Sequence, residues 1–228
     1  MKKPYVNAGF TLIEMALVLL VLTLLLGGLL IPLGTQIEQR DIVATEKKLA
    51  EINEALIGYA LAKGYLPCPD ADSDGQEDAR NATGGCPDQG NLPWITLGVG
   101  ETDAWGSRFI YRVTSRFSNG TTRFTLVSDG DIRICRTSEG GACAADSLLA
   151  NDAPWVVLSR GKNRGLCGSP PAAANCVADE QENADINNVF VTRVGSHQQA
   201  ALGEFDDILV WLSPYILKNR MVAAGKLP

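Results

Sequence analysis

The sequence is poor in the residues and motifs from which many metal centres, nucleic-acid surfaces and hydrolytic sites are built. One histidine, His197, occurs among 228 residues and there is no Cys-x-x-Cys pair, so we expect no multi-histidine or zinc centre. Basic residues number 20 against 26 acidic ones, a net charge of -6, so the charge does not indicate nucleic-acid binding. Ser159, His197 and Asp206 supply the residue types of a hydrolytic triad, but Gly-x-Ser-x-Gly and Gly-x-x-x-x-Gly-Lys motifs are missing. We therefore expect a protein that is not an enzyme.

What the sequence does contain is a long apolar run near its start. Residues 10–33 carry one charged side chain, Glu14. As a helix these 24 residues would extend ~36 Å, which exceeds the ~30 Å hydrocarbon core of a bilayer. The run is too long for a cleaved secretory signal, so we expect a retained membrane span. Lys2 and Lys3 precede the span and no basic excess follows it, which predicts a cytoplasmic N-terminus with the rest of the chain across the membrane.

Glu14 is the unusual residue of this run, because a carboxylate in an apolar span costs ~2.5–3.5 kcal/mol even on insertion scales. If the chain is cut between Gly9 and Phe10, the new α-amino group has an ordinary pKa of ~8 and is positively charged. The carboxylate of Glu14 on an adjacent helix could neutralise that charge and set the axial register of the two helices. The alternative is a glutamate that reaches the headgroups or is protonated.

The order Lys2-Lys3, then Gly9-Phe10-Thr11-Leu12-Ile13-Glu14, then about twenty apolar residues resembles the N-terminus of type IV pilins and type II secretion pseudopilins. The resemblance implies that prepilin peptidase cuts after Gly9, that the new N-terminal Phe10 is methylated and that Glu14 is the assembly residue. It also implies that residues 1–9 are a leader peptide. Other pilin or pseudopilin subunits would be the assembly partners.

The apolar run continues into an amphipathic segment over residues 34–64. Apolar residues recur there with helical spacing, namely Ile42, Leu49, Ile52, Leu56 and Tyr59. Gly64 is a suitable residue to end the helix. Gly27, Gly28 and Pro32 predict a kink or a locally melted turn, unless the helix simply tolerates them. We therefore expect one helix from Thr11 to Lys63 whose second half packs on a globular head.

The head, residues 65–228, is expected to be α+β, with the long helix laid on a mainly antiparallel sheet in a type IV pilin-like arrangement. Residues 65–100 read as a long loop. Strands are predicted over 109–114, 123–127, 132–135, 155–158, 189–192 and 208–212, with a hairpin at Asn119-Gly120. Ser213-Pro214 opens a short terminal helix that ends near Gly225.

Six cysteines indicate an oxidising compartment. They allow 15 pairings, and loop-closure entropy favours neighbours in sequence. The preferred pairs are Cys68 with Cys86, Cys135 with Cys143, and Cys167 with Cys176.

Two acidic clusters are candidate sites. Asp70, Asp72, Asp74 and Gly75 match the first half of an EF-hand loop, but Asn81 stands where the bidentate glutamate belongs. Calcium binding and a solvated acidic loop are both open for this segment. The second cluster, Asp179, Glu180, Glu182 and Asp185, is expected on the surface, as is His197. The four tryptophans are expected in the core more than on a sugar-stacking platform.

The function expected from the resemblance is that of a minor pilin or pseudopilin. A looser resemblance to minor-pilin heads rests on Leu66-Pro67-Cys68-Pro69-Asp70, Leu92-Pro93-Trp94, Asp103-Ala104-Trp105-Gly106 and Phe205-Asp206-Asp207. The subunit would be single-pass in the inner membrane with a periplasmic head, and its filament could reach the cell surface. The alternatives are a membrane-anchored periplasmic enzyme or binding domain, and a filament-tip adhesin that binds calcium or glycan.

Overall fold

The computed structural model describes residues 9–163, 178–196 and 203–227, except that the side chains of residues 25–33 lie outside the described residues. The chain divides into two compact units after Asp41. Helix α1, Leu12–Lys63, supplies most of the first unit and begins the second.

The bounds of α1 agree with the sequence prediction. Thr11 precedes the first helical residue, and Gly64 follows the last one with a φ of +82°. The Gly64 N–H donates to the Ala60 carbonyl at 2.7 Å, so glycine ends the helix in the left-handed conformation that other residues avoid. The backbone stays helical through Gly27, Gly28 and Pro32, so the predicted melted turn is not observed.

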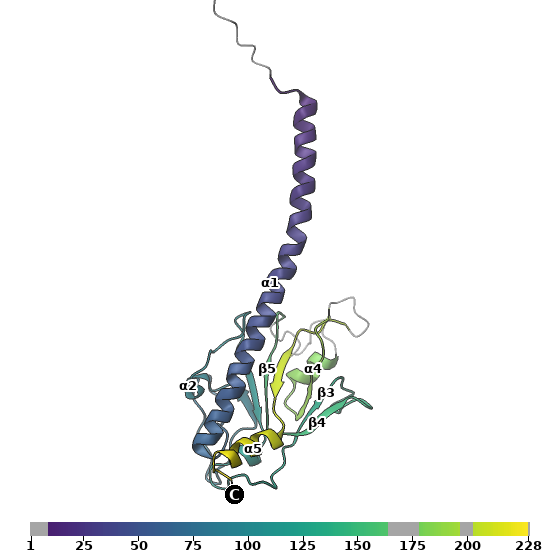
Figure 1. Cartoon of the computed structure of the whole chain (residues 1–228). Helices are drawn as coiled ribbons and strands as arrows, with labels where there is room; N and C mark the ends of the chain where they lie inside the picture. Colours follow the sequence, from purple (N-terminus) through teal and green to yellow (C-terminus); the bar gives the residue numbers. More distant parts are fainter. Residues whose placement is uncertain (1–8, 164–177, 197–202, 228) are drawn as a thin grey trace, which may run out of the picture. The chain divides into compact units, whose positions relative to one another are not determined.

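The described part of the head contains two sheets (Figure 1). The first is antiparallel throughout, in the order β1 (Gln89–Asn91), β2 (Ile110–Val113), β5 (Trp155–Ser159), β7 (Ile208–Trp211). The second has the order β4 (Leu148–Ala153), β3 (Ile132–Cys135), β6 (Val189–Val191), and only its β3–β6 pair is parallel. The prediction of an α+β head with a mainly antiparallel sheet is therefore confirmed.

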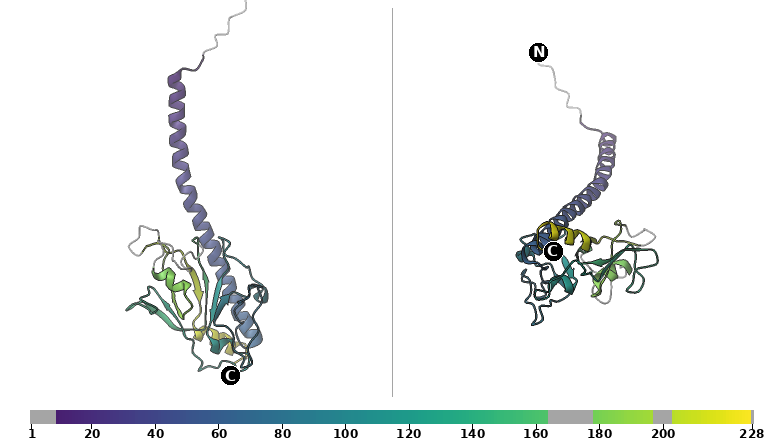
Figure 2. Two further views of the ribbon diagram at one scale, coloured as in Figure 1. Left: turned by 180° about the vertical axis from the view of Figure 1, so that it is seen from behind. Right: turned by 60° about the horizontal axis from the view of Figure 1, so that its bottom comes forward.

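The four-stranded sheet is covered on both faces, which explains why β5 reads as a continuous apolar run. Its residues Trp155 and Val157 join the main core with Leu49, Ile52 and Leu56 of α1. Leu217 and Met221 of the terminal helix α5 (Pro214–Ala223) join the same core. On the opposite face Val156 packs with Ile134 and Phe190 of the three-stranded sheet. Figure 2 shows the head from behind and from below.

Several local predictions for the head are wrong. Residues 123–127 form no strand, and Asn119-Gly120 turns no hairpin, because β2 pairs with β5 instead. The Asn119 Oδ1 accepts the backbone N–H groups of Thr121 and Thr122, and its Nδ2 donates to the Thr83 carbonyl, so it stabilises a local turn. The stretch expected as loop contains β1 and the short helix α2 (Trp94–Leu97). Strand β4 and helices α3 (Ser115–Ser118) and α4 (Ala178–Ala184) were also not predicted.

Candidate functional site

The predicted assembly residue, Glu14, lies in the first turn of α1 and is bonded to Thr11. The Glu14 Oε2 accepts the Thr11 N–H and the Thr11 hydroxyl, both at 3.0 Å. The Glu14 N–H donates to the Thr11 Oγ1 at 3.3 Å. This reciprocal pair is a capping box, in which Thr11 is the N-cap and Glu14 the third helical residue. The Thr-x-x-Glu spacing is visible in the sequence, but this capping role of Glu14 was not predicted.

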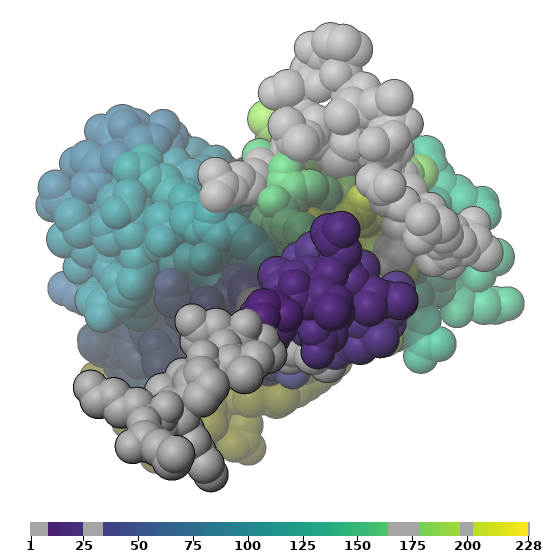
Figure 3. All heavy atoms as spheres, turned by 90° about the horizontal axis from the view of Figure 1, so that it is seen from above, coloured from purple at the N-terminus to yellow at the C-terminus, as the bar shows by residue number. Residues whose placement is uncertain are grey.

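The side chains around Glu14 expose a large apolar surface. Every described side chain from residue 9 to residue 24 is exposed, including Phe10 at 83% and Leu12 at 92%. Figure 3 shows this N-terminal segment in purple from above. Within the part of the chain that the structure describes, no helix combines the length and the apolar character needed to cross a membrane. The side chains of residues 25–33, which complete the predicted span, are not among the described ones.

The predicted cleavage junction lies just before the helix. Gly9 and Phe10 are non-helical and exposed, and a Cβ added to Gly9 would meet no atom within 4 Å. Of the predicted leader, residues 1–8 lie outside the described residues, including Lys2 and Lys3. Gly9 and Phe10 are therefore presented on an open backbone segment, one turn away from Glu14.

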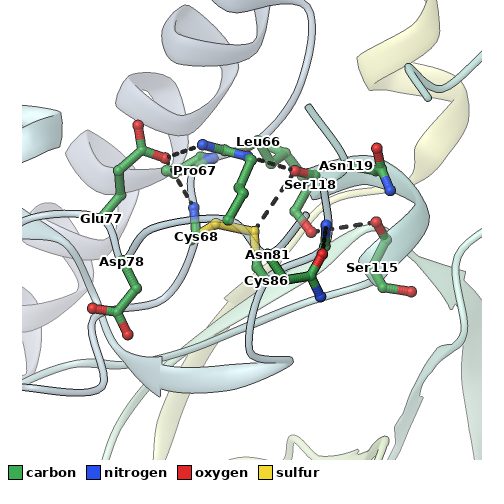
Figure 4. The surroundings of a disulfide bond; sticks show 12 residues. Leu66, Pro67, Cys68, Glu77, Asp78, Asn81, Cys86, Ser115, Ser118 and Asn119 are labelled. Atoms are coloured by element: carbon green, nitrogen blue, oxygen red, sulfur yellow. Dashed lines mark hydrogen bonds and ion pairs between the residues drawn. A yellow bond between two sulfur atoms is a disulfide. The ribbon is translucent and has the colours of Figure 1, made fainter. Parts of the chain in front are cut away.

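Two of the three predicted disulfides are present. Cys68 pairs with Cys86 and Cys135 pairs with Cys143, with Cα–Cα distances of 5.3 and 5.4 Å. Figure 4 shows the first pair, where the Glu77 carboxylate accepts the Cys68 N–H and lies 3.0 Å from Arg80. Cys167 and Cys176 lie outside the described residues. The two bonds indicate an oxidising compartment for the head.

The predicted calcium loop is organised by its own hydrogen bonds. Asp70 is fully buried, and its carboxylate accepts the backbone N–H groups of Ser73, Asp74 and Gly75. One oxygen each from Asp70, Asp72 and Asp78 lie within 4.8 Å of one another, whereas Asp74 does not belong to this group. Asp78 was missed, although it occupies the ninth position of the EF-hand pattern. Calcium binding at this loop stays a prediction.

Replacing Asp70 with asparagine is expected to destabilise the head by ~1–3 kcal/mol, because an amide oxygen replaces a buried carboxylate that accepts three backbone N–H groups. Urea unfolding of the full chain in detergent measures the change in the free energy of unfolding. The control is Asp72→Asn, where an exposed carboxylate accepts one backbone N–H. Equal losses from the two variants would contradict this role for Asp70.

Ser159, Trp94 and Trp155 are among the described residues with hydrolytic or stacking potential. The Ser159 hydroxyl is fully buried and donates to the Asp103 Oδ2 at 2.7 Å. Trp155 is fully buried, and Trp94 has Arg108 over its ring, with the Arg108 Cζ 4.7 Å from the ring centroid. His197 lies outside the described residues.

Three of the four residues of the second acidic cluster are buried, which corrects the prediction of a surface cluster, whereas Asp185 is exposed as predicted. Asp179, Glu180 and Glu182 belong to α4 and are 6%, 3% and 6% exposed. Asp179 forms an ion pair with Arg193 at 3.0 Å. The Glu182 carboxylate accepts the Gly141 N–H and an Asn187 side-chain N–H. Burial of these charges depends on partners that are remote in sequence, and the local composition carried no signal for it.

Comparisons with known proteins add no relative to this description. No protein-family model matches the chain, and no curated protein or solved structure matches it either. The features that indicate a function are accordingly the N-terminal motif and the geometry around Glu14.

Proposed function

We propose that the chain is a structural subunit, a minor pilin or pseudopilin, which is processed by prepilin peptidase and assembled into a type IV pilus-like or type II secretion filament. Cleavage occurs between Gly9 and Phe10, and the new N-terminal Phe10 is methylated. Residues 10–33 hold the subunit in the inner membrane, and the disulfide-bonded head lies on the periplasmic side. The observation that carries the proposal is the Glu14 carboxylate held one turn beyond the cleavage junction, within a segment, residues 10–24, whose apolar side chains are exposed.

The capping box supports the assembly role because it determines where the carboxylate is held. Two donors of Thr11 hold the Glu14 Oε2 at the positive end of the helix dipole, which stabilises a negative charge. The α-amino group released at Phe10 is a cation of ordinary pKa ~8 at the start of an identical helix. A pair between that amine and the Glu14 of a neighbouring subunit neutralises two charges in an apolar bundle and aligns the helices axially.

The apolar surface supports association by the same segment. Phe10, Leu12 and Ile13 are each at least 75% exposed and surround the carboxylate. In the membrane such side chains contact lipid, and in a filament they contact the helices of neighbouring subunits. Association of subunits through residues 10–33 would therefore both cover the exposed apolar side chains and pair the Glu14 charge.

Mass spectrometry of the mature N-terminus tests the maturation step. We expect a chain that begins at Phe10 and carries one added methyl group, because the exposed Gly9-Phe10 bond is accessible to a membrane peptidase. A Gly9→Val variant serves as the control and should keep its leader. An intact leader in the wild type, or cleavage near Gly27, contradicts the proposal.

A further inference from the structure

Three carboxylates that are remote in sequence meet in the head. Glu180 comes from α4, and Asp206 and Asp207 come from the segment before β7. One oxygen of each lies within 4.8 Å of the others, and Glu180 is 3% exposed. Together these three residues are called the carboxylate cluster below.

Hydrogen bonds through the cluster connect the two sheets. The Asp206 N–H donates to the Glu180 Oε1 at 3.0 Å. Asn163, which follows β5, donates its backbone N–H to the Asp206 Oδ2 and its side-chain N–H to the Glu180 Oε2. Strands β5 and β7 belong to the four-stranded sheet, whereas α4 contacts β6 of the three-stranded sheet. The cluster therefore lies where the two sheets are joined.

Asn183 of α4 extends this junction to the third carboxylate. Its side-chain N–H groups donate to the Asp207 Oδ2 at 2.8 Å and to the Val191 carbonyl at 3.0 Å. Its Oδ1 accepts the Val191 N–H at 2.7 Å. One buried amide thus binds both β6 and the residue directly before β7.

Other charged groups among the described residues act on the cluster. The Asp206 Oδ1 is buried and accepts no hydrogen bond from the residues that the structure describes. Glu204 adds a further negative charge, while Arg160 acts favourably on Asp207. Arg193 of the segment after β6 forms an ion pair with Asp179 of α4. Lys162, next to Asn163, is a further basic residue of this region, and it is not without a partner. Burial, followed by repulsion from Glu180, raises the pKa of Asp206 to about 7; burial and the negative charges of Glu180 and Asp206 raise the pKa of Asp207 to about 8.

We propose that the carboxylate cluster is a proton-controlled contact. While the cluster is protonated, it holds α4 against the start of β7, and when the cluster is fully ionised, this contact loosens. A bound proton removes repulsion between carboxylates that the fold keeps together. When α4 and the segment before β7 separate, the carboxylates gain water and release the proton readily. Opening of the junction is therefore linked to proton release, and it becomes more favourable as the pH rises from ~4, the ordinary carboxyl pKa, toward 8.

Hydrogen exchange of the full chain in detergent tests this proton-controlled contact. After correction for the intrinsic pH dependence of exchange, we expect amides of residues 178–184 and 204–211 to open at least about tenfold more often at pH 8 than at pH 5. Amides in the middle of β2 serve as an internal reference. Exchange in α4 and β7 that changes no more with pH than exchange in β2 overturns the proposal.

Two variants assign the effect to the cluster. Asp206→Asn and Asp207→Asn replace an ionisable group by a neutral one of the same shape, so each should flatten the pH dependence and retain protection at pH 8. The matched control is Asp88→Asn, because Asp88 is an exposed carboxylate. A pH dependence that survives in both cluster variants, or that Asp88→Asn also removes, contradicts the assignment.

A second measurement keeps the proposal testable if the variants do not fold. Carbon NMR of side-chain carboxyl groups in the wild-type chain should show aspartates that titrate near 7 and 8. Midpoints that all lie below 5 overturn the proposal. Calcium is also added at pH 8. If it restores protection in the wild type but not in the cluster variants, a cation and not a proton neutralises the cluster, and this result also overturns the proposal.

Discussion

Replacing Glu14 with alanine is expected to abolish filament incorporation while membrane insertion survives. Removing one partner of an ion pair in an apolar bundle leaves the other charge without compensation, which costs ~3–5 kcal/mol, or a loss of at least about a hundredfold in assembly. Insertion does not suffer, because the variant no longer places a carboxylate in the apolar run. The measurement compares the amount of subunit in sheared filaments with the amount in the membrane fraction.

Glu14→Gln separates charge from capping. A glutamine oxygen can still accept the Thr11 donors that now bind the Glu14 Oε2, but it carries no charge to pair with an α-amino group. We expect this variant to assemble as poorly as Glu14→Ala. Glu46→Ala is the control, since Glu46 is exposed elsewhere on α1.

Two results would contradict the function proposed for the chain. If Glu14→Gln assembles like the wild type, the role of the side chain is to cap its own helix. If Glu14→Ala changes nothing, the chain behaves as an independent membrane-anchored domain. The second result would favour a periplasmic enzyme or binding domain.

Loss of the Cys68–Cys86 bond is expected to produce the largest loss of head stability among the changes considered. This bond closes a loop of sequence separation 18, and loop-closure entropy predicts a loss of about 3 kcal/mol when both cysteines become serine. The Cys68 N–H also donates to Glu77, so loosening of the loop disturbs the Glu77–Arg80 pair. Urea unfolding of the full chain in detergent measures the loss.

The Cys135–Cys143 bond is the matched control. Its sequence separation is 8, and the same relation predicts a loss of about 2.5 kcal/mol for the double serine variant. A variant with all four of these cysteines replaced by serine should approach the sum of the two losses if the bonds act independently. A larger loss from the shorter loop would contradict the entropic explanation.

Local features of the fold were predictable because their causes are close together in sequence. The helix from Thr11 to Lys63 follows from continuous apolar and amphipathic periodicity, and Gly64 ends it through its own backbone freedom. Strands β2, β3, β5, β6 and β7 lie within segments rich in β-branched or aromatic residues, and each lies in or overlaps its predicted range. Near neighbours among the cysteines pair as loop closure favours.

Pairing between strands could not be predicted in the same way. Asn119-Gly120 is a strong local turn signal, but β2 pairs with β5 instead. Strand β5 is covered by apolar residues on both faces, so this pairing places β2 beside the buried centre of the sheet. The amide of Asn119 is then used for a local turn and for a contact with Thr83. A local hairpin signal was overridden by long-range burial.

The N-terminal motif, the long helix and the local strand segments follow from the amino-acid sequence alone, because each depends on residue type and spacing over a few turns or strands. The environment of the charged groups depends on the folded arrangement of the chain. Helix α4, with the sequence ADEQENA, has no apolar stripe, yet Glu180 is buried because Asn163 and Asp206 supply its donors from remote segments. Whether a carboxylate is solvated, paired or protonated depends on which distant groups the fold brings to it, and residue spacing along the chain does not contain that information.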